Sequence, residues 1–357
     1  MTALGTLPRV IQVASGREWR GGERQVLLLA RALRDQGLEQ LLVTNGAGRL
    51  AAELRGAGIP IRPVAGRPSA FAAIWGEARR QPAILHAHDA HSLTLAGAAA
   101  RLTGRPLIAT RRVDRPLRHR GFWPRADRIV AVSEAVHAVL LADGIDPARI
   151  VVIHSGIDLV RARGSPTPEI RAQLGLPATG PLVVTAGALA PEKGQRFLIE
   201  AAALLRPSHP AVVWAIAGDG PLRQALERLV ADRGLGGVVR FLGELEEPTR
   251  LVGAATVFVS SSVQEAFGGA ILEAMAVGTP VIATRVGGVP ELVGEGAGIL
   301  VDPANPNQLA RAVAELLSDE RARRRVTMVA TQRVEQFTAE GMAAKVCQVY
   351  RSVVIEH

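Results

Sequence analysis

Short apolar runs alternate with segments of helical length along nearly the whole chain. In the first half these runs include RVIQVAS at residues 9–15 and AILHAH at residues 83–88, and in the second half LVVTAGA at residues 182–188 and VFVSSS at residues 257–262. Runs of this length, followed by helical segments, predict parallel strands with helices on both faces of the sheet. The two series of repeats therefore predict an α/β protein with two doubly wound domains.

A stretch rich in proline, glycine and arginine separates the two series. It covers residues 161–180, and its composition is typical of a linker. We expect an N-terminal domain over residues 1–165 and a C-terminal domain over residues 166–337.

The sequence also bears on the compartment. No apolar run is long enough to span a bilayer, and the first residues lack the charged, apolar and small-residue succession of a signal peptide. Cys347 is the only cysteine, which excludes an internal disulfide framework and a Cys-based zinc site. These features predict a cytoplasmic protein.

Positive charge is concentrated in the first half. The net charge is +9, and residues 1–165 hold 24 Lys and Arg against 13 Asp and Glu. Seven arginines fall within residues 110–128, interleaved with Phe122 and Trp123. Such a cluster suits a phosphorylated acceptor or anionic lipid headgroups, and it suits nucleic acid less because no nucleic-acid motif is present. The alternative is a solvated, arginine-rich surface.

The most informative stretch reads EAFGGAILE and covers residues 265–273. We expect a helix to begin near Gly268 and Gly269, where unpaired N–H groups and the helix dipole form an anion site. Glu273, one turn into that helix, could accept hydrogen bonds from the hydroxyls of a ribose. Glu265 would reach another part of the same ligand. A phosphate flanked by two polyols describes a nucleotide sugar, but the spacing also suits an ordinary loop acid and helical glutamate.

A second glycine pair follows the first predicted strand. Ligands of open α/β sheets bind beyond the carboxyl ends of the strands, and Gly21 and Gly22 would open a helix there. They predict a second phosphate site, although such a pair is often only a tight turn. Sites of this kind in both domains predict that the domains face each other across a cleft.

Histidines crowd the end of another predicted strand. The segment HAHDAHS contains His86, His88, Asp89 and His91 and is similar to a metal-binding H-x-H-x-D-H pattern. The aspartate falls one position early, and no other cluster offers the remaining ligands. We expect no metal, and we expect one of the histidines to reach the cleft.

Lysine is rare in this chain, which contains only Lys193 and Lys345. Lys193 follows a predicted strand near a helix start, where it could pair with a diphosphate and stabilise the charge of a leaving group. In AIAGDGPLR, Arg223 occupies the third glycine position of G-x-G-x-x-G, so the NAD fingerprint is absent.

Together these motifs resemble glycosyltransferase family 4, the retaining GT-B enzymes, from about Val10 to Leu317. The family implies two Rossmann-like domains around a cleft, a C-terminal helix over residues 338–357 that packs on the N-terminal domain, and no metal. The motifs that carry the resemblance are, in order, GGERQ, HAHDAHS, VAVSEAV, VIHSGID, GALAPEKG, AIAGDGPLR, VRFLG and EAFGGAILEAMAVGTPVIAT.

The resemblance assigns roles in the second domain. Glu273 would hold the ribose hydroxyls, and Glu265 the hydroxyls of the donor sugar. Phe267, Gly268 and Gly269 would present backbone amides to the sugar and phosphate.

The remaining implied roles involve both domains. Lys193 would contact the diphosphate, Gly22, next to Gly21, would lie beside the β-phosphate, and His88 would line the reacting sugar. The arginine that the family places beside this lysine on the diphosphate is Ala188 here.

Another arginine would have to replace the missing cation, and three candidates stand out: Arg285, Arg17 and Arg20. The family's N-G-I-D stretch also reads SGID here, which is a milder change.

The motifs therefore predict a glycosyltransferase without a cofactor, and the resemblance implies that it is a retaining one. Its donor would be a nucleotide diphosphate sugar, with a UDP-sugar or GDP-mannose favoured. Its acceptor would be a hydroxyl of a glycan or lipid-linked molecule that carries phosphate, as in synthesis of lipopolysaccharide or another cell-envelope polysaccharide, at the inner face of an anionic membrane. The alternatives are a nucleotide-sugar epimerase of the same architecture and a non-catalytic nucleotide-sugar-binding protein.

Overall fold

The structure, a computed structural model, describes residues 7–16, 18–164 and 169–356. The chain forms two compact units. The first unit comprises Met1–Gly156 and Phe337–His357, and the second unit comprises Ile157–Gln336. The boundary expected at residues 165 and 166 falls on residues outside the described ranges.

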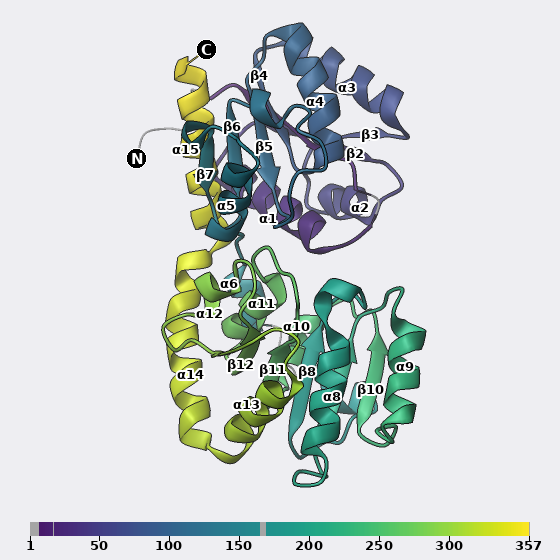
Figure 1. Ribbon diagram of the computed structural model, residues 1–357. Coiled ribbons are helices and arrows are strands. Elements are labelled where there is room, and N and C mark those ends of the chain that lie inside the picture. The colour runs from purple at the N-terminus through teal and green to yellow at the C-terminus, as the bar shows by residue number, and fades with distance from the viewer. Residues whose placement is uncertain (1–6, 17, 165–168, 357) are drawn as a thin grey trace. The chain divides into compact units, whose positions relative to one another are not determined.

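The first unit is built on a seven-stranded parallel sheet with the order β3-β2-β1-β4-β5-β6-β7 (Figure 1). The central strands are buried along nearly their whole length and are mostly apolar, as expected for parallel strands covered on both faces. The strands are β1 (Arg9–Ala14), β2 (Gln40–Asn45), β3 (Ile61–Val64), β4 (Ala83–Ala87), β5 (Leu107–Arg111), β6 (Arg128–Ala131) and β7 (Ile150–Val152).

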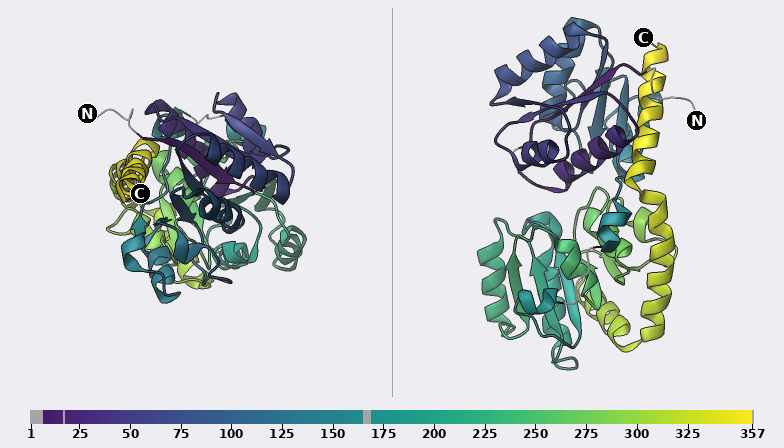
Figure 2. Two further views of the ribbon diagram at one scale, coloured as in Figure 1. Left: turned by 90° about the horizontal axis from the view of Figure 1, so that it is seen from above. Right: turned by 180° about the vertical axis from the view of Figure 1, so that it is seen from behind.

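Helices cover both faces of this sheet. α15 packs beside α1, and α3 packs beside α4 (Figures 1 and 2). The helices are α1 (Gly21–Asp35), α2 (Arg49–Gly56), α3 (Arg67–Arg80), α4 (Ala90–Thr103), α5 (Glu134–Ala142) and α15 (Ala339–Glu356), with 3-10 turns η2 (Trp123–Arg125), η3 (Pro147–Arg149) and η5 (Val334–Phe337).

The C-terminal helix α15 is part of the core of the first unit. Its buried side chains, with Tyr350 at the centre, share one apolar cluster with Leu29 and Leu33 of α1 and with Ile84 of β4. Near the start of this helix, the side-chain amide of Gln25 forms two hydrogen bonds with the backbone of Gly156. Its Nε2 donates to the carbonyl oxygen at 2.8 Å, and its Oε1 accepts from the amide at 3.0 Å.

A buried polar contact also ties α15 to the sheet. The ring of His86 on β4 contacts the Tyr350 hydroxyl at 2.7 Å through Nδ1 and the Thr110 hydroxyl at 2.8 Å through Nε2. His86 and Tyr350 are completely buried. Burial, with a smaller contribution from the charge of Arg112, lowers the pKa of His86 to about 3. The ring is therefore neutral in the folded protein.

The second unit contains a six-stranded parallel sheet with the order β10-β9-β8-β11-β12-β13. Both sheets run first to one side of their starting strand and then to the other, so the prediction of two doubly wound parallel sheets is confirmed. The strands are β8 (Leu182–Ala186), β9 (Val213–Ala217), β10 (Val239–Gly243), β11 (Val257–Ser260), β12 (Val281–Thr284) and β13 (Ile299–Val301).

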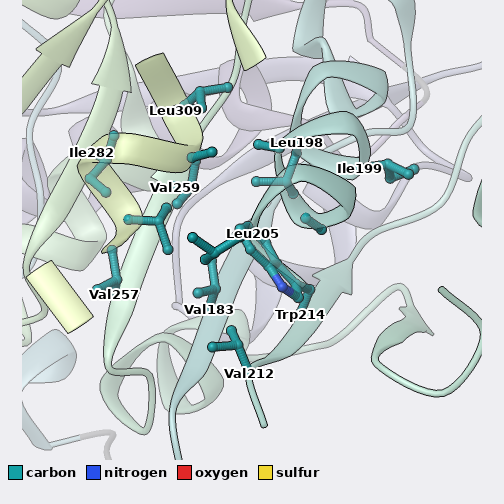
Figure 3. Packing of buried hydrophobic residues seen from close by; sticks show 14 of the residues in the cluster. Val183, Leu198, Ile199, Leu205, Val212, Trp214, Val257, Val259, Ile282 and Leu309 are labelled. Carbon is teal, nitrogen blue, oxygen red and sulfur yellow. The ribbon is translucent and has the colours of Figure 1, made fainter. Parts of the chain in front are cut away.

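An apolar cluster in the second unit joins this sheet to the helices that pack on it. Leu198 and Leu205 of α8 and Leu309 of α13 pack on strand residues that include Val257 and Trp214 (Figure 3). The helices are α6 (Leu159–Gly164), α7 (Ile170–Gln173), α8 (Gln195–Leu205), α9 (Arg223–Asp232), α10 (Pro248–Gly253), α11 (Gly269–Ala276), α12 (Val289–Val293), α13 (Pro306–Ser318) and α14 (Glu320–Arg333), with the 3-10 turn η4 (Pro191–Lys193). Within the described part of the chain, no helix is both long enough and apolar enough to cross a bilayer.

The close approach of residue 156 to α15 predicts that Gly156→Ala destabilises the first unit. A Cβ there would lie 2.8 Å from the Cα of Ala339 and 2.9 Å from the carbonyl oxygen of Thr338, which are backbone atoms that cannot rotate away. We expect the free energy of unfolding in urea to fall by about 1–3 kcal/mol. Gly76→Ala is the matched control, since no atom lies within 4 Å of its added Cβ and α3 gains up to about 1 kcal/mol. Equal stability of both variants would contradict this packing.

The neutral His86 predicts a pH-dependent stability. Its pKa is lower in the folded than in the unfolded chain, so the unfolded chain binds more protons as the pH falls from about 6.5 towards 3. Stability is fully present above pH 6.5 and is lost across that window. In His86→Gln, the free energy of unfolding should fall less steeply below pH 6.5, by up to about 1.4 kcal/mol per pH unit. Urea denaturation between pH 4 and 7.5 measures these slopes.

Tyr350→Phe is the control for this measurement. It removes the hydrogen bond to His86 but leaves the buried ring, so it should lower stability at every pH and keep the wild-type slope. A His86→Gln variant with the wild-type slope would show that His86 is not the titrating group.

Candidate functional site

The order of each sheet reverses at one point, and the sequence-predicted residues lie in the loops there. In the first unit the reversal is between β1 and β4, and in the second it is between β8 and β11. The connections leave in opposite directions at such a point, so a crevice opens at the carboxyl ends of the two strands.

In the second unit, the loops that follow β8 and β11 are fastened to each other. The Ser261 hydroxyl donates to the carbonyl of Lys193 at 3.1 Å, and the Val263 amide donates to the carbonyl of Glu192 at 2.8 Å. Gly194 has φ +61°, and a Cβ at this residue would lie 2.2 Å from the carbonyl oxygen of Ser261. Only glycine permits this approach, which fixes the backbone on both sides of the lysine.

This fastening brings Lys193 and Glu265 together across 72 residues of sequence. Nζ of Lys193 lies 2.5 Å from Oε2 of Glu265, and the Ser262 hydroxyl lies 3.5 Å from the same oxygen. The lysine side chain is 30% exposed and the glutamate 17%. A partly exposed ion pair contributes little to stability. The contact between Lys193 and Glu265 can therefore be broken when either side chain binds a ligand.

The glycine pair of EAFGGAILE lies where the helix was expected. α11 begins at Gly269 after Gly268, whose φ of +112° favours glycine. The first intrahelical acceptor is the carbonyl of Gly268, which bonds the Leu272 amide at 3.0 Å, so the amides of residues 269–271 precede the helical ladder. The side chain of Phe267 is buried, with 3% exposed, so this residue can offer a ligand only its backbone.

Glu273 lies one turn into α11 and is half-buried. The hydroxyl of Thr249, on α10, donates to its Oε2 at 3.4 Å. No local pattern singles out Thr249, because its proximity to Glu273 depends on the contact of α10 with α11. The second unit therefore gathers a cation, two carboxylates and a helix N-terminus at the β8–β11 reversal.

In the first unit, the loops after β1 and β4 are joined by Asp89. Its carboxylate accepts hydrogen bonds from the amide and hydroxyl of Ser15 at 3.1 and 3.0 Å, and from the amide of Ser92 at 2.7 Å, which caps α4. Asp89 thus has a structural role. α1 begins at Gly21, as expected, and the carboxylate of Glu23 in its first turn accepts from the Arg20 amide at 3.2 Å.

The three histidines near the end of β4 do not converge on one point. His86 contacts Tyr350 and Thr110, whereas His91 is exposed in the first turn of α4. His88 is 5% exposed, with its Nε2 2.7 Å from Oε1 of Gln12. Within the described ranges, no group of three or more His, Cys, Asp or Glu side chains could hold a metal ion.

His88 also has a partner at its second nitrogen. Nη2 of Arg112 lies 3.4 Å from Nδ1. Burial holds the pKa of His88 well below its usual range, with smaller contributions from the repulsion that protonation of both His86 and His88 would create and from the charge of Arg112. This ring is neutral and both of its nitrogens are occupied.

Three arginines are the candidates to replace the cation that is missing at Ala188. Arg285 is exposed after β12, and Nε of Arg20 forms an ion pair with Glu18 at 2.5 Å. Arg17 lies outside the described residues.

Several arginines of the 110–128 cluster serve the fold of the first unit. Arg111 lies over the Trp123 ring at 5.3 Å, Arg120 donates to the carbonyl of Gly144 at 2.6 Å, and Arg128 pairs with Glu356 on α15. Sequence reasoning did not separate Arg112 from these neighbours. Its position directly after the strand PLIATR was the available signal, since this places it at the ligand-binding edge of the sheet.

Comparison with known families agrees with this division of the chain. Residues 19–161 match the family described as Glycosyltransferase Family 4, and residues 166–333 match the family described as Glycosyl transferases group 1.

Among curated relatives, the D-inositol 3-phosphate glycosyltransferase of Corynebacterium urealyticum is 35% identical over 63% of this chain and 57% of its own length. The protein of the same name from Acidothermus cellulolyticus is 31% identical over 80% and 71%. The alpha-maltose-1-phosphate synthase of Mycolicibacterium smegmatis is 33% identical over 64% of each. The chain spans about half the length of several of these relatives, 54% and 52% in two further cases.

Solved structures share the fold. HepE of Anabaena, in complex with UDP-glucose, has a TM-score of 0.85 and 24% identity, with 96% of this chain and 99% of that chain covered. Sucrose-phosphate synthase from Thermosynechococcus elongatus has a TM-score of 0.78 and 23% identity, with 98% and 100% covered. The matches to both halves of the sequence and the relative covered over 71% of its length establish that the chain belongs to glycosyltransferase family 4.

Proposed function

We propose that this chain is a retaining glycosyltransferase that uses a nucleotide diphosphate sugar as donor. The observation that carries the proposal is the set of groups at the β8–β11 reversal: the Lys193–Glu265 pair, the N-terminus of α11, and Glu273 one turn further. A cation, helix amides and two carboxylates are what a diphosphate flanked by two polyols needs. Membership of the family supports the same reaction.

Each group has a role in this proposal. Glu273 accepts hydrogen bonds from the ribose hydroxyls, and the amides after Gly268 bind phosphate oxygens. Lys193 leaves Glu265 for the diphosphate, where its charge stabilises the leaving group as the glycosidic bond breaks. Glu265 is then available to the hydroxyls of the donor sugar. The ion pair of the free protein therefore keeps both side chains near their working positions.

The donor class follows from the family and its relatives. HepE binds UDP-glucose, as its structure shows, and a UDP-sugar or GDP-mannose is the donor that we propose for this chain. Relatives named D-inositol 3-phosphate glycosyltransferase and alpha-maltose-1-phosphate synthase support an acceptor that carries phosphate. The positive charge of residues 1–165 suits such an acceptor, whether a small phosphorylated polyol or a lipid-linked glycan.

We predict that Glu273→Gln and Lys193→Met impair the enzyme in different ways. Glu273→Gln removes a charged acceptor and should weaken nucleotide binding by about 10- to 100-fold. Lys193→Met should lower the transfer rate by about 100-fold, because a cation at the leaving group is lost. Calorimetry and initial rates, with UDP-glucose, UDP-galactose, UDP-N-acetylglucosamine and GDP-mannose, measure both effects.

Matched controls exist for these substitutions. Glu246→Gln changes an exposed glutamate of the second unit, and Lys345→Met changes the other lysine of the chain, which is exposed on α15. Both should behave as wild type. Full activity of Glu273→Gln and Lys193→Met would contradict the site. Conversion of the donor sugar without acceptor would identify an epimerase, and saturable binding without nucleotide release would identify a binding protein.

The exposed part of the arginine cluster supports attraction to an anionic membrane. Arg115, Arg118, Arg120 and Arg125 are exposed in the segment between β5 and β6. We predict that vesicles with anionic lipid retain the protein in flotation assays and release it as salt rises towards 0.5 M, because screening shortens the reach of surface charge. Salt-independent retention, or no retention at low salt, would contradict this attraction.

A further inference from the structure

Arg112 carries a positive charge that the fold of the first unit does not balance with a close carboxylate. It follows β5, and none of the ion pairs within 4.0 Å among the described residues includes it. Its Nε is shielded from solvent and has no hydrogen-bond partner in the described part of the chain. The side chain is partly buried, and a cation in such a place without a close counter-charge costs free energy, which favours a functional reason for it.

The side chain of Arg112 remains charged in this place. Burial lowers its pKa to about 10, and the carboxylate of Glu23 opposes that shift from beyond ion-pair distance. At neutral pH the guanidinium is therefore protonated. Burial also raises the pKa of Glu23, which bonds the Arg20 amide at the start of α1.

A chain of side-chain amides determines what His88 presents to this cation. Nε2 of Gln40 donates to the carbonyl oxygen of Ala30 at 2.6 Å, and a carbonyl oxygen can only accept a hydrogen bond. Oε1 of Gln40 therefore accepts from Nε2 of Gln12 at 2.6 Å, and Oε1 of Gln12 faces Nε2 of His88 at 2.7 Å. The proton of the neutral ring must lie on Nε2. Nδ1 is then the acceptor, and it receives Nη2–H of Arg112 at 3.4 Å.

This chain of bonds gives His88 a positioning role. Both nitrogens of the neutral His88 ring have partners. His88 holds the guanidinium of Arg112 through Nη2 and leaves Nε without a hydrogen-bond partner. The relay runs from the interior of α1 through β2 and β1 to the loop after β4, so the arginine is held by rigid elements.

The N-terminus of α1 lies beside the side chain of Arg112. A Cβ at Gly22 would lie 3.8 Å from Cδ of Arg112, so the arginine side chain passes the first turn of this 15-residue helix. The first bond to a helical carbonyl is from the Arg24 amide to the carbonyl of Arg20, at 3.1 Å. The carboxylate of Glu23 accepts from the amides of Arg20 and Glu23, whereas the amides of Gly21 and Gly22 precede the helical ladder. Two independent groups of donors, helix amides and the Nε–H of Arg112 without a partner, thus meet at the first turn of α1.

We propose that Arg112 binds a phosphate oxyanion of a substrate together with the first-turn amides of α1, and that His88 is the residue that positions it. The inference rests on the proposed function. A planar guanidinium can donate Nε–H and Nη–H to two oxygens of one phosphate. This contact would give Nε of Arg112 a hydrogen-bond acceptor and would neutralise the positive charge of the side chain. The phosphate belongs either to the diphosphate of the donor or to a phosphate monoester on the acceptor.

The test compares Arg112→Gln and Arg112→Lys with Arg55→Gln, which removes an exposed arginine from α2 of the same unit. Calorimetry measures binding of UDP and inorganic pyrophosphate for the donor source, and of glucose 1-phosphate and inositol 1-phosphate for the acceptor source. Arg112→Gln should weaken one of these pairs at least tenfold and leave the other unchanged. Arg112→Lys should recover part of that loss, and Arg55→Gln should bind all four as wild type does.

The thermal midpoint of the free protein separates this site from a structural role. Removing a partly buried cation without a close counter-charge should leave the midpoint of Arg112→Gln unchanged or higher, whereas loss of a structural contact would lower it. Wild-type affinity of Arg112→Gln for all four probes would overturn the inference, as would a wild type that binds none of them. If the wild type binds pyrophosphate or a phosphate monoester through Arg112 but transfers no sugar from any donor, the inference stands and the proposed function fails.

The role of His88 is tested by two further variants. His88→Asn keeps an acceptor near the place of Nδ1 and should retain most of the phosphate affinity, whereas His88→Leu should lose as much as Arg112→Gln. The double variant His88→Leu/Arg112→Gln should lose no more than either single variant, since both act on one contact. Equal loss of kcat in His88→Asn and His88→Leu, with unchanged phosphate affinity, would show that His88 acts on the substrate directly.

Discussion

The reversal of strand order in each parallel sheet is the constraint on which the candidate sites depend. Beside β1 and β4, and beside β8 and β11, the chain leaves neighbouring strands in opposite directions. No crossover covers the carboxyl ends of those strands, so loop amides and side chains remain open to a ligand. In each unit a side chain forms hydrogen bonds that join the two loops. Asp89 does so in the first unit, and Ser261 in the second.

Electrostatics differs between the two places. In the second unit the cation of the candidate site is held by a carboxylate, because Lys193 contacts Glu265 in a partly exposed pair. In the first unit Arg112 is held by a neutral histidine instead, and its charge is left without a close partner. A paired cation must exchange its partner when a phosphate binds, whereas an unpaired one gains a partner. In general, an unpaired cation lowers the stability of a free protein and strengthens its binding of an anion.

The two buried histidines of the HAH pattern, His86 and His88, have different roles. His86 and His88 are two residues apart on or just after one strand, and both are neutral because burial lowers their pKa values. His86 faces Tyr350 and joins α15 to the sheet, whereas His88 faces Gln12 and Arg112 at the ligand-binding edge. One half of the pattern HAH thus maintains the fold, and the other half connects the fold to the candidate site.

The sequence by itself determined the local elements, because strand and helix periodicity and glycine-marked helix starts are properties of consecutive residues. It predicted two doubly wound sheets and a helix beginning at the glycines before Glu273. The tertiary structure decided which distant side chains meet. It joined Lys193 to Glu265, and it chose Arg112 from a run of arginines that look alike in sequence. It also gave both nitrogens of His88 to protein partners, since sheet order and hydrogen-bond direction decide such contacts and neither is written in local spacing.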